Sequence, residues 1–168
     1  MKRSSRSFKL TIMALFVAIG LVLQYAEGRL IVTTVPGGKL GLCNIVAIIN
    51  IFMFGGANAL VISFIRSLLG GFISGGAIST IYSVAGAVLS TGAMSVVKKF
   101  LHPKVSMIGI SVVGAVVHNL TQIIVAVLFY KCIYLFSYVP ILLVLATVSG
   151  CITGLAAQII SRRIKERF

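Results

Sequence analysis

The stretch LGLCNIVAIINIFMFGGANALVISFIRSLL, Leu40 to Leu69, decides how often the chain crosses a membrane. It is apolar over 30 residues apart from three asparagines, two serines and one arginine. A spanning helix needs about 20 mainly apolar residues, so one tilted helix or two short helices could both account for it. The paired glycines in FGGAN, Phe54 to Asn58, mark the expected break, and Asn58 is expected to cap the second helix.

The composition is that of an integral membrane protein. Of 168 residues, 59% are hydrophobic and the mean hydropathy is +1.14, whereas soluble domains are roughly half apolar. This length leaves no room for a separate soluble domain, so we expect one all-α membrane domain over residues 1–168. With the break at the glycines, the predicted spans are residues 8–24, 40–54, 57–72, 77–97, 105–130 and 138–160.

The basic residues favour six spans over five. The chain carries 15 Lys and Arg against two acids, a net charge of +13. With six spans, eleven basic residues fall on the side of the N-terminus and only Arg29, Lys39 and Lys131 on the other, whereas five spans give a weaker bias. By the positive-inside rule both termini are cytoplasmic, and the chain belongs in the bacterial cytoplasmic membrane. Charge clustered beside spans also argues against nucleic acid as a partner.

Arg66 is the first candidate for a binding site, because it lies a little past halfway along the predicted span 57–72. A charge at mid-membrane costs roughly 2.5–3.5 kcal/mol, so it should face the bundle interior, a partner or an anion. Alternatively, the long side chain reaches toward the interface and the arginine is structural.

The span GISVVGAVVHNLTQIIVA, Gly109 to Ala126, carries a polar stripe. Ser111, Gly114, His118 and Gln122 follow at spacings of 3, 4 and 4 and share one helix face, with Asn119 beside them. His118, Asn119 and Gln122 are candidates to hydrogen-bond a ligand, or else they bond neighbouring helices. In 77–97 a small-residue series, Ser79, Ser83, Gly86, Ser90 and Ala93, predicts close helix packing, as does the GxxxG of Gly150 and Gly154.

Several kinds of chemistry are excluded. Glu27 and Glu166 are the only acids, which leaves no carboxylate pair for acid/base catalysis, no Mg²⁺-diphosphate site and no intramembrane acid for ion-coupled transport. Cys43, Cys132 and Cys151 lack metal-ligand spacing, so neither a metal nor a cofactor is expected. We therefore expect no enzymatic activity from this chain alone.

Lys39 follows two glycines in VPGGKLGLCN, Val35 to Asn44, at the predicted mouth of the bundle. This is no P-loop, because Leu40 stands where Ser or Thr is needed and the flanks are membrane helices. Lys39, with Asn44 about one turn further, is a candidate to bind an anion. It could equally be an interfacial anchor beside a simple turn.

Three segments, PGGKLGLCNI (Pro36 to Ile45), RSLLGG (Arg66 to Gly71) and GISVVGAVVHNLTQ (Gly109 to Gln122), resemble the Gx transporter family. This family is also labelled heptaprenyl diphosphate synthase component I and is related to the substrate-binding S components of energy-coupling factor (ECF) transporters. Cys43 stands where alanine or another small residue would be usual. The resemblance implies a six-helix, S-component-like fold that binds a small molecule from outside.

In ECF systems a transmembrane scaffold and ATPases, supplied in trans, drive uptake, and an AxxxA pair on the first helix contacts the scaffold. Ala14 and Ala18 match that pair. The hypothesis is a subunit that captures a small anionic vitamin, isoprenoid or quinone precursor, or flavin-type molecule, through Lys39, Asn44, Arg66, His118, Asn119 and Gln122. The alternative is an accessory membrane subunit of an isoprenoid, quinone or flavin-based electron-transfer system. The absence of any aspartate argues against a synthase in this chain.

Overall fold

The computed structural model describes residues 6–30 and 41–167, and every regular element in those ranges is helical. The elements are α1 (Arg6–Leu30), α2 (Asn44–Phe54), α3 (Gly56–Leu101), α4 (Met107–Tyr130), the short 3-10 helix η1 (Ile133–Tyr138) and α5 (Val139–Arg167). Five segments are long and apolar enough to cross a membrane: Ser7–Gly28, Gly56–Ile73, Gly76–Leu101, Met107–Tyr130 and Ile133–Arg163. The all-helical membrane fold is therefore confirmed for the described residues.

The break predicted at the paired glycines is present. α2 ends at Phe54, Gly55 adopts φ 85°, and α3 begins at Gly56. The predicted capping role of Asn58 is wrong in direction: its Nδ2 atom donates to the Phe54 carbonyl at 2.7 Å and so closes the end of α2, not the start of α3. The cause is that α3 begins two residues before Asn58, which places this side chain inside the first turn.

The prediction of six full spans is not confirmed, because α2 has only 11 residues. That is about 16 Å of helix at 1.5 Å per residue, roughly half of the hydrocarbon thickness. α2 instead forms the centre of the core. Its residues Ala47, Ile48, Ile49 and Ile51 are buried together with Ala59, Met94, Ile110 and Ala157 from α3, α4 and α5.

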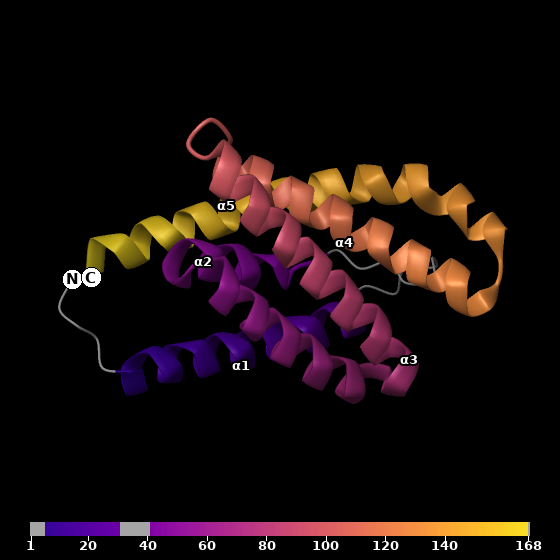
Figure 1. The fold of residues 1–168 in the computed structure, drawn as a ribbon, viewed down its shortest axis with the longest axis horizontal. Coiled ribbons are helices and arrows are strands. Elements are labelled where there is room, and N and C mark those ends of the chain that lie inside the picture. Colours follow the sequence, from indigo (N-terminus) through magenta and orange to yellow (C-terminus); the bar gives the residue numbers. More distant parts are fainter. Residues whose placement is uncertain (1–5, 31–40, 168) are drawn as a thin grey trace.

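α3 is a helical hairpin, in which two helical arms, Gly56–Ile73 and Gly76–Leu101, meet at a turn (Figure 1). Gly76 has φ 77°, a left-handed conformation that glycine adopts without strain, and the chain reverses there. The two arms then lie side by side, since the Thr91 hydroxyl donates to the Ser63 hydroxyl at 2.9 Å. The predicted separation of 57–72 from 77–97 therefore holds.

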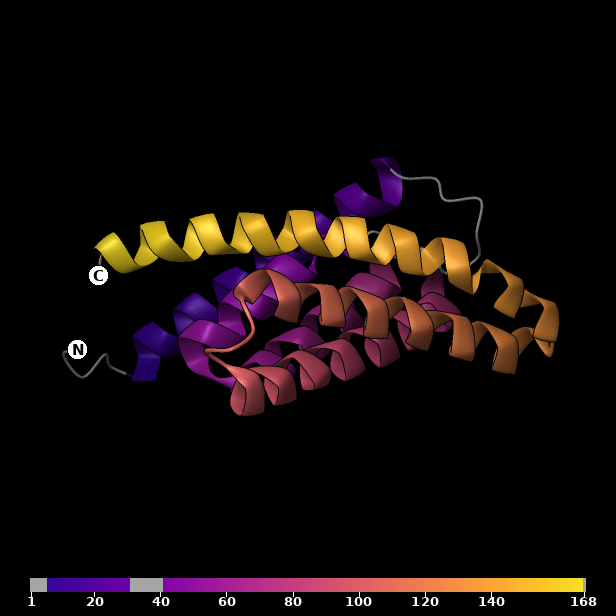
Figure 2. The same cartoon turned by 90° about the horizontal axis from the view of Figure 1, so that it is seen from above.

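The two ends of the bundle differ in charge. The start of α1, the connection between α3 and α4, and the end of α5 lie at one end, while the turn of α3 and η1 lie at the other (Figures 1 and 2). We call the first the basic end. Its exposed side chains include Lys9, Lys99, Lys104, Arg162 and Arg163.

α4 and α5 approach closely through glycines. A Cβ atom on Gly150 would lie 2.7 Å from the Val112 Cα atom, and one on Gly154 would lie 2.7 Å from the Ile108 Cα atom. Between them, the hydroxyls of Ser111 and Thr153 are hydrogen-bonded at 2.9 Å. The GxxxG pair is therefore a helix contact, as predicted.

Candidate functional site

Arg66 is buried where α3 passes α1. Its side chain is only 4% exposed, and its Nη1 atom donates to the Oε1 atom of Gln24 at 2.9 Å. The amide nitrogen of Gln24 in turn donates to the Ser83 hydroxyl at 3.4 Å, which links α1 to the second arm of α3. Arg66 therefore faces the bundle interior, as one of its two sequence-based interpretations predicted.

Two glycines make room for this arrangement. A Cβ atom on Gly20 would collide with the Cδ atom of Arg66, so α1 must carry glycine where the arginine stem crosses it. A Cβ atom on Gly70 would lie 2.5 Å from the amide carbon and oxygen of Gln24. The contact between Arg66 and Gln24 thus depends on close approach of the two backbones.

Glu27 lies one turn beyond Gln24 and is 4% exposed. Its Oε1 atom accepts a hydrogen bond from the backbone nitrogen of Gly41 at 2.6 Å, which ties the end of α1 to the segment just before α2. The sequence-based statement that no acid lies within the membrane helices is therefore wrong. The first apolar segment extends to Gly28, not to Gln24, and so includes Glu27.

A small polar cavity joins these groups. Its volume is about 20 Å³, and it is lined by Gln24, Glu27, Gly41, Cys43, Arg66, Ser83 and His118. A cavity of this size holds about one water molecule, whereas small-molecule sites measure roughly 300–1,000 Å³. A ligand of vitamin size would therefore enter only if the surrounding helices moved apart.

His118 brings α4 to the same cavity. The ring is buried, and a Cβ atom on Gly86 would lie 2.9 Å from its Cε1 atom, so the glycine allows α3 to pack directly on the imidazole. Gly86 and Ser83 belong to the small-residue series of the second α3 arm. The series was predicted to serve packing alone, yet Ser83 also accepts the hydrogen bond from Gln24.

The amides of Asn44 and Gln122 are nearly inaccessible to solvent, at 3% and 1% exposure. Among the residues that the structure describes, the Nδ2 atom of Asn44 and both amide atoms of Gln122 have no hydrogen-bond partner. Buried amides without partners cost roughly 1–3 kcal/mol, so such groups suit an added ligand or water. Asn44 adjoins the cavity through Gly41, since a Cβ atom there would lie 2.9 Å from Nδ2.

The other candidates lie elsewhere. Asn119 donates from Nδ2 to the Leu142 carbonyl at 3.4 Å, a contact between α4 and α5. Ala14 and Ala18 are exposed on α1, as a contact face for a partner requires. Lys39 lies outside the described residues. The structure thus brings Arg66, His118 and Asn44 together and leaves Asn119 in a helix contact.

Sequence reasoning missed Gln24, Glu27 and Ser83 as parts of this site. Gly20, Gln24 and Glu27 follow one another at spacings of 4 and 3, which places them on one face of α1. That spacing is a usable sequence signal, but a first span that ends at Gln24 leaves Glu27 outside the helix face. Within the described ranges, no three His, Cys, Asp or Glu side chains gather in a way that could hold a metal ion.

Residues 16–160 match the family model described as heptaprenyl diphosphate synthase component I. The chain belongs to the heptaprenyl diphosphate synthase component I family. The match covers nearly all of the described helices, including every residue that lines the cavity. No curated protein and no solved structure matches the chain at a significant level. The family description names a component, which implies partner subunits, and the apolar helices make the chain a membrane protein.

Proposed function

We propose that the chain is the substrate-binding membrane subunit of an ECF-like importer and captures a small anionic molecule. The observation that carries this proposal is the hydrogen bonding of the buried Arg66 side chain. Within residues 6–30 and 41–167, its guanidinium makes one hydrogen bond, to a neutral amide, although it has five N–H donors. A buried cation is expensive to maintain unless an anion compensates it during function.

The other groups around Arg66 fit a polar ligand. His118 and Ser83 line the same cavity, and the Asn44 amide is adjacent. Gln122, with a free donor and a free acceptor among the described residues, would bond a ligand that extends along α4. We propose that Glu27 holds the start of α2 through Gly41 and limits the net positive charge, while Arg66 selects the anion.

Capture requires the cavity to expand, because its present volume suits only a water molecule. We propose that ligand entry separates α1 from the first arm of α3, since Gln24 and Arg66 are the polar link between them. The energy for release would come from ATPase subunits acting through a membrane scaffold bound at Ala14 and Ala18. The chain itself would be no enzyme, and its location would be the bacterial cytoplasmic membrane with both termini inside.

The experiment compares ligand content and uptake in two arginine variants. The protein is purified from its native membrane, and small anions released on denaturation are identified by mass spectrometry. Arg66→Ala should lose the released anion and lower its cellular uptake at least about tenfold, the effect of roughly 1.4 kcal/mol. Arg163→Ala, an exposed arginine at the basic end, is the matched control. Equal anion content in both variants would refute the proposal.

The family description supports a second candidate, an accessory subunit of an isoprenoid, quinone or flavin-linked system. Under it, Arg66 and His118 would be packing residues, and the exposed faces would anchor an enzyme. Cross-linking in native membranes separates the two proposals. Recovery of ATPases and a scaffold supports the importer, and recovery of a prenyl synthase or flavoprotein supports the accessory role.

A further inference from the structure

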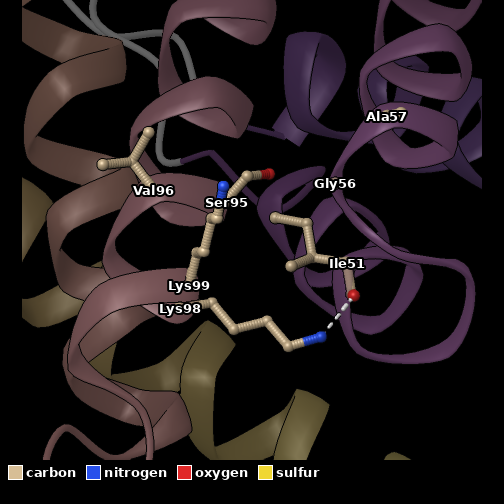
Figure 3. Close-up of a pocket in the computed structure, with 7 residues that line it drawn as sticks. All are labelled: Ile51, Gly56, Ala57, Ser95, Val96, Lys98 and Lys99. Atoms are coloured by element: carbon tan, nitrogen blue, oxygen red, sulfur yellow. Dashed lines mark hydrogen bonds between the residues drawn. The ribbon is translucent and has the colours of Figure 1, made fainter.

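A second and larger hollow lies at the basic end, and it shares no lining residue with the polar cavity. Its volume is about 420 Å³, and it is lined by Ile51, Gly56, Ala57, Ser95, Val96, Lys98 and Lys99 (Figure 3). It therefore lies where the end of α2 meets the first and last turns of α3. Its size is in the range of small-molecule sites, and the cavity at Arg66 does not explain it.

The two lysines of this hollow have different surroundings. Lys98 crosses it, and its Nζ atom donates to the Ile51 carbonyl at 2.7 Å (Figure 3). The same Nζ atom lies 4.4 Å from the centre of the Phe52 ring. Lys98 thereby stabilises the negative end of the α2 dipole. Lys99 is exposed beside it. None of the lining residues is acidic, so no carboxylate in the lining would repel an anion at Lys99.

An exposed apolar stripe runs from the lysines along α3. On the second arm, Leu89, Gly92, Val96 and Lys99 share a face at spacings of 3, 4 and 3, and Leu89 and Val96 are 56% exposed. A Cβ atom on Gly92 would meet nothing within 4 Å. On the first arm, Val61 and Phe64 are 51% and 46% exposed and follow Ala57, which lines the hollow.

We propose that this hollow and the apolar stripe bind one anionic phospholipid, with its phosphate at Lys98 and Lys99 and an acyl chain over Gly92. The charge argues for an anion, and the exposed apolar stripe leading away from it argues for an amphiphile over a free phosphate ion. Basic pockets between helices at the cytoplasmic face suit anionic head groups, because anionic lipids there attract juxtamembrane lysines. The bound lipid would brace the end of α2, which is too short to reach across the membrane itself.

The test is native mass spectrometry of the full chain in detergent with equal amounts of phosphatidylglycerol and phosphatidylcholine. One phosphatidylglycerol molecule should remain bound to the chain in preference to phosphatidylcholine. Lys99→Gln should lower this preference roughly fivefold, the effect of one lysine near an anionic surface. The matched controls are Lys104→Gln, an exposed lysine at the same end, and Lys131→Gln at the opposite end. An equal loss in either control would overturn the proposal, because general basicity would then explain the retention.

Gly92→Leu tests the position of the acyl chain without altering charge. The space at Gly92 is open and leucine favours helix, so the variant should fold. It should lower retention of phosphatidylglycerol at least about fivefold, which is about 1 kcal/mol. Unchanged retention in Gly92→Leu, equal binding of both lipids, or displacement by millimolar inorganic phosphate would each overturn the proposal. Occupation of the stripe by a second copy of the chain, seen as a dimer, would overturn it as well.

Discussion

The Nη1 atom of Arg66 donates a hydrogen bond to the Oε1 atom of Gln24 over 2.9 Å, and this contact joins α3 to α1 inside the bundle. A neutral amide orients the guanidinium without cancelling its charge. The proposed binding of an anion depends on this cation, which the hydrogen bond holds in place. The hydrogen bond of Gln24 to Ser83 extends the link to the second arm of α3.

Gln24→Leu keeps the volume of the side chain and removes the acceptor. A lost hydrogen bond to a charged group should lower the free energy of unfolding by about 1.5–3 kcal/mol. Titration with dodecyl sulfate in mixed micelles measures this quantity. Gln24→Glu, which restores an acceptor, should recover the loss, and Gln158→Leu on α5 is the matched control. If Gln24→Leu and Gln158→Leu were equally stable, the bond would not support the fold.

Gly20→Ala should disturb the same contact through the backbone. The added methyl group would collide with the Cδ atom of Arg66, and overpacking of this kind costs about 1–3 kcal/mol. Gly28→Ala, on the same helix but with nothing within 4 Å, should stabilise the protein by up to about 1 kcal/mol. Thermal unfolding by circular dichroism compares the two variants. A Gly20→Ala protein as stable as Gly28→Ala would show that α1 is not held against Arg66.

Hydrophobic runs and glycine breaks made most of the fold predictable. The break at Gly55 and Gly56 and the reversal near Gly76 both follow from paired glycines between apolar runs. The length of α2 was not predictable in this way, since Leu40 to Cys43 are as apolar as the helix that follows them. Hydropathy gives the extent of an apolar run, and the hydrogen-bonding of its first residues decides where the helix begins.

The candidate site was predictable only in part. Residue spacing shows which side chains share a helix face, but it does not show which other helix that face contacts. The spacing of Ser111, His118 and Gln122 correctly indicated a buried face. Which helix that face meets depends on Gly86, whose missing side chain accommodates the His118 ring. The Gln24 amide fits into the site only because Gly70, which has no side chain, lies next to it.

Gly150→Leu should separate α4 from α5. The new side chain would start 2.7 Å from the Val112 Cα atom, which is backbone and cannot move aside alone. We expect the free energy of unfolding to fall by about 1–3 kcal/mol. Titration with dodecyl sulfate in mixed micelles, as for Gln24→Leu, measures this change. Gly92→Ala, where the space is open, should be neutral or stabilising. Equal stability of the two variants would contradict close packing at this GxxxG pair.

Ala14→Leu combined with Ala18→Leu tests the proposed scaffold contact. Both alanines are exposed, so the variant should fold normally. If a scaffold helix packs closely there, the larger side chains should lower recovery of the partner subunits at least about tenfold, measured by mass spectrometry after affinity purification. Ala77→Leu, an exposed alanine on α3, is the control. Recovery equal to that of the control would place the partner on another face.

Cys43 reports directly on the charge of the cavity, because its side chain lines it beside Arg66. The closed cavity holds about one water molecule, so these reagents reach Cys43 only while the proposed separation of α1 from α3 opens it. During that opening, the field of the arginine should raise the reaction rate of an anionic methanethiosulfonate (sulfonatoethyl) relative to a cationic one (trimethylammonium-ethyl). Arg66→Gln should lower the anion-to-cation rate ratio at Cys43 roughly tenfold, the order of a unit charge acting at short range in a partly buried site. The same ratio at Cys132, which does not line the cavity, corrects for the intrinsic reactivity of the reagents. Each cysteine is measured with the other two replaced by serine. An unchanged ratio at Cys43 would mean that Arg66 does not set the potential of the cavity, and an anionic substrate would then have no basis there.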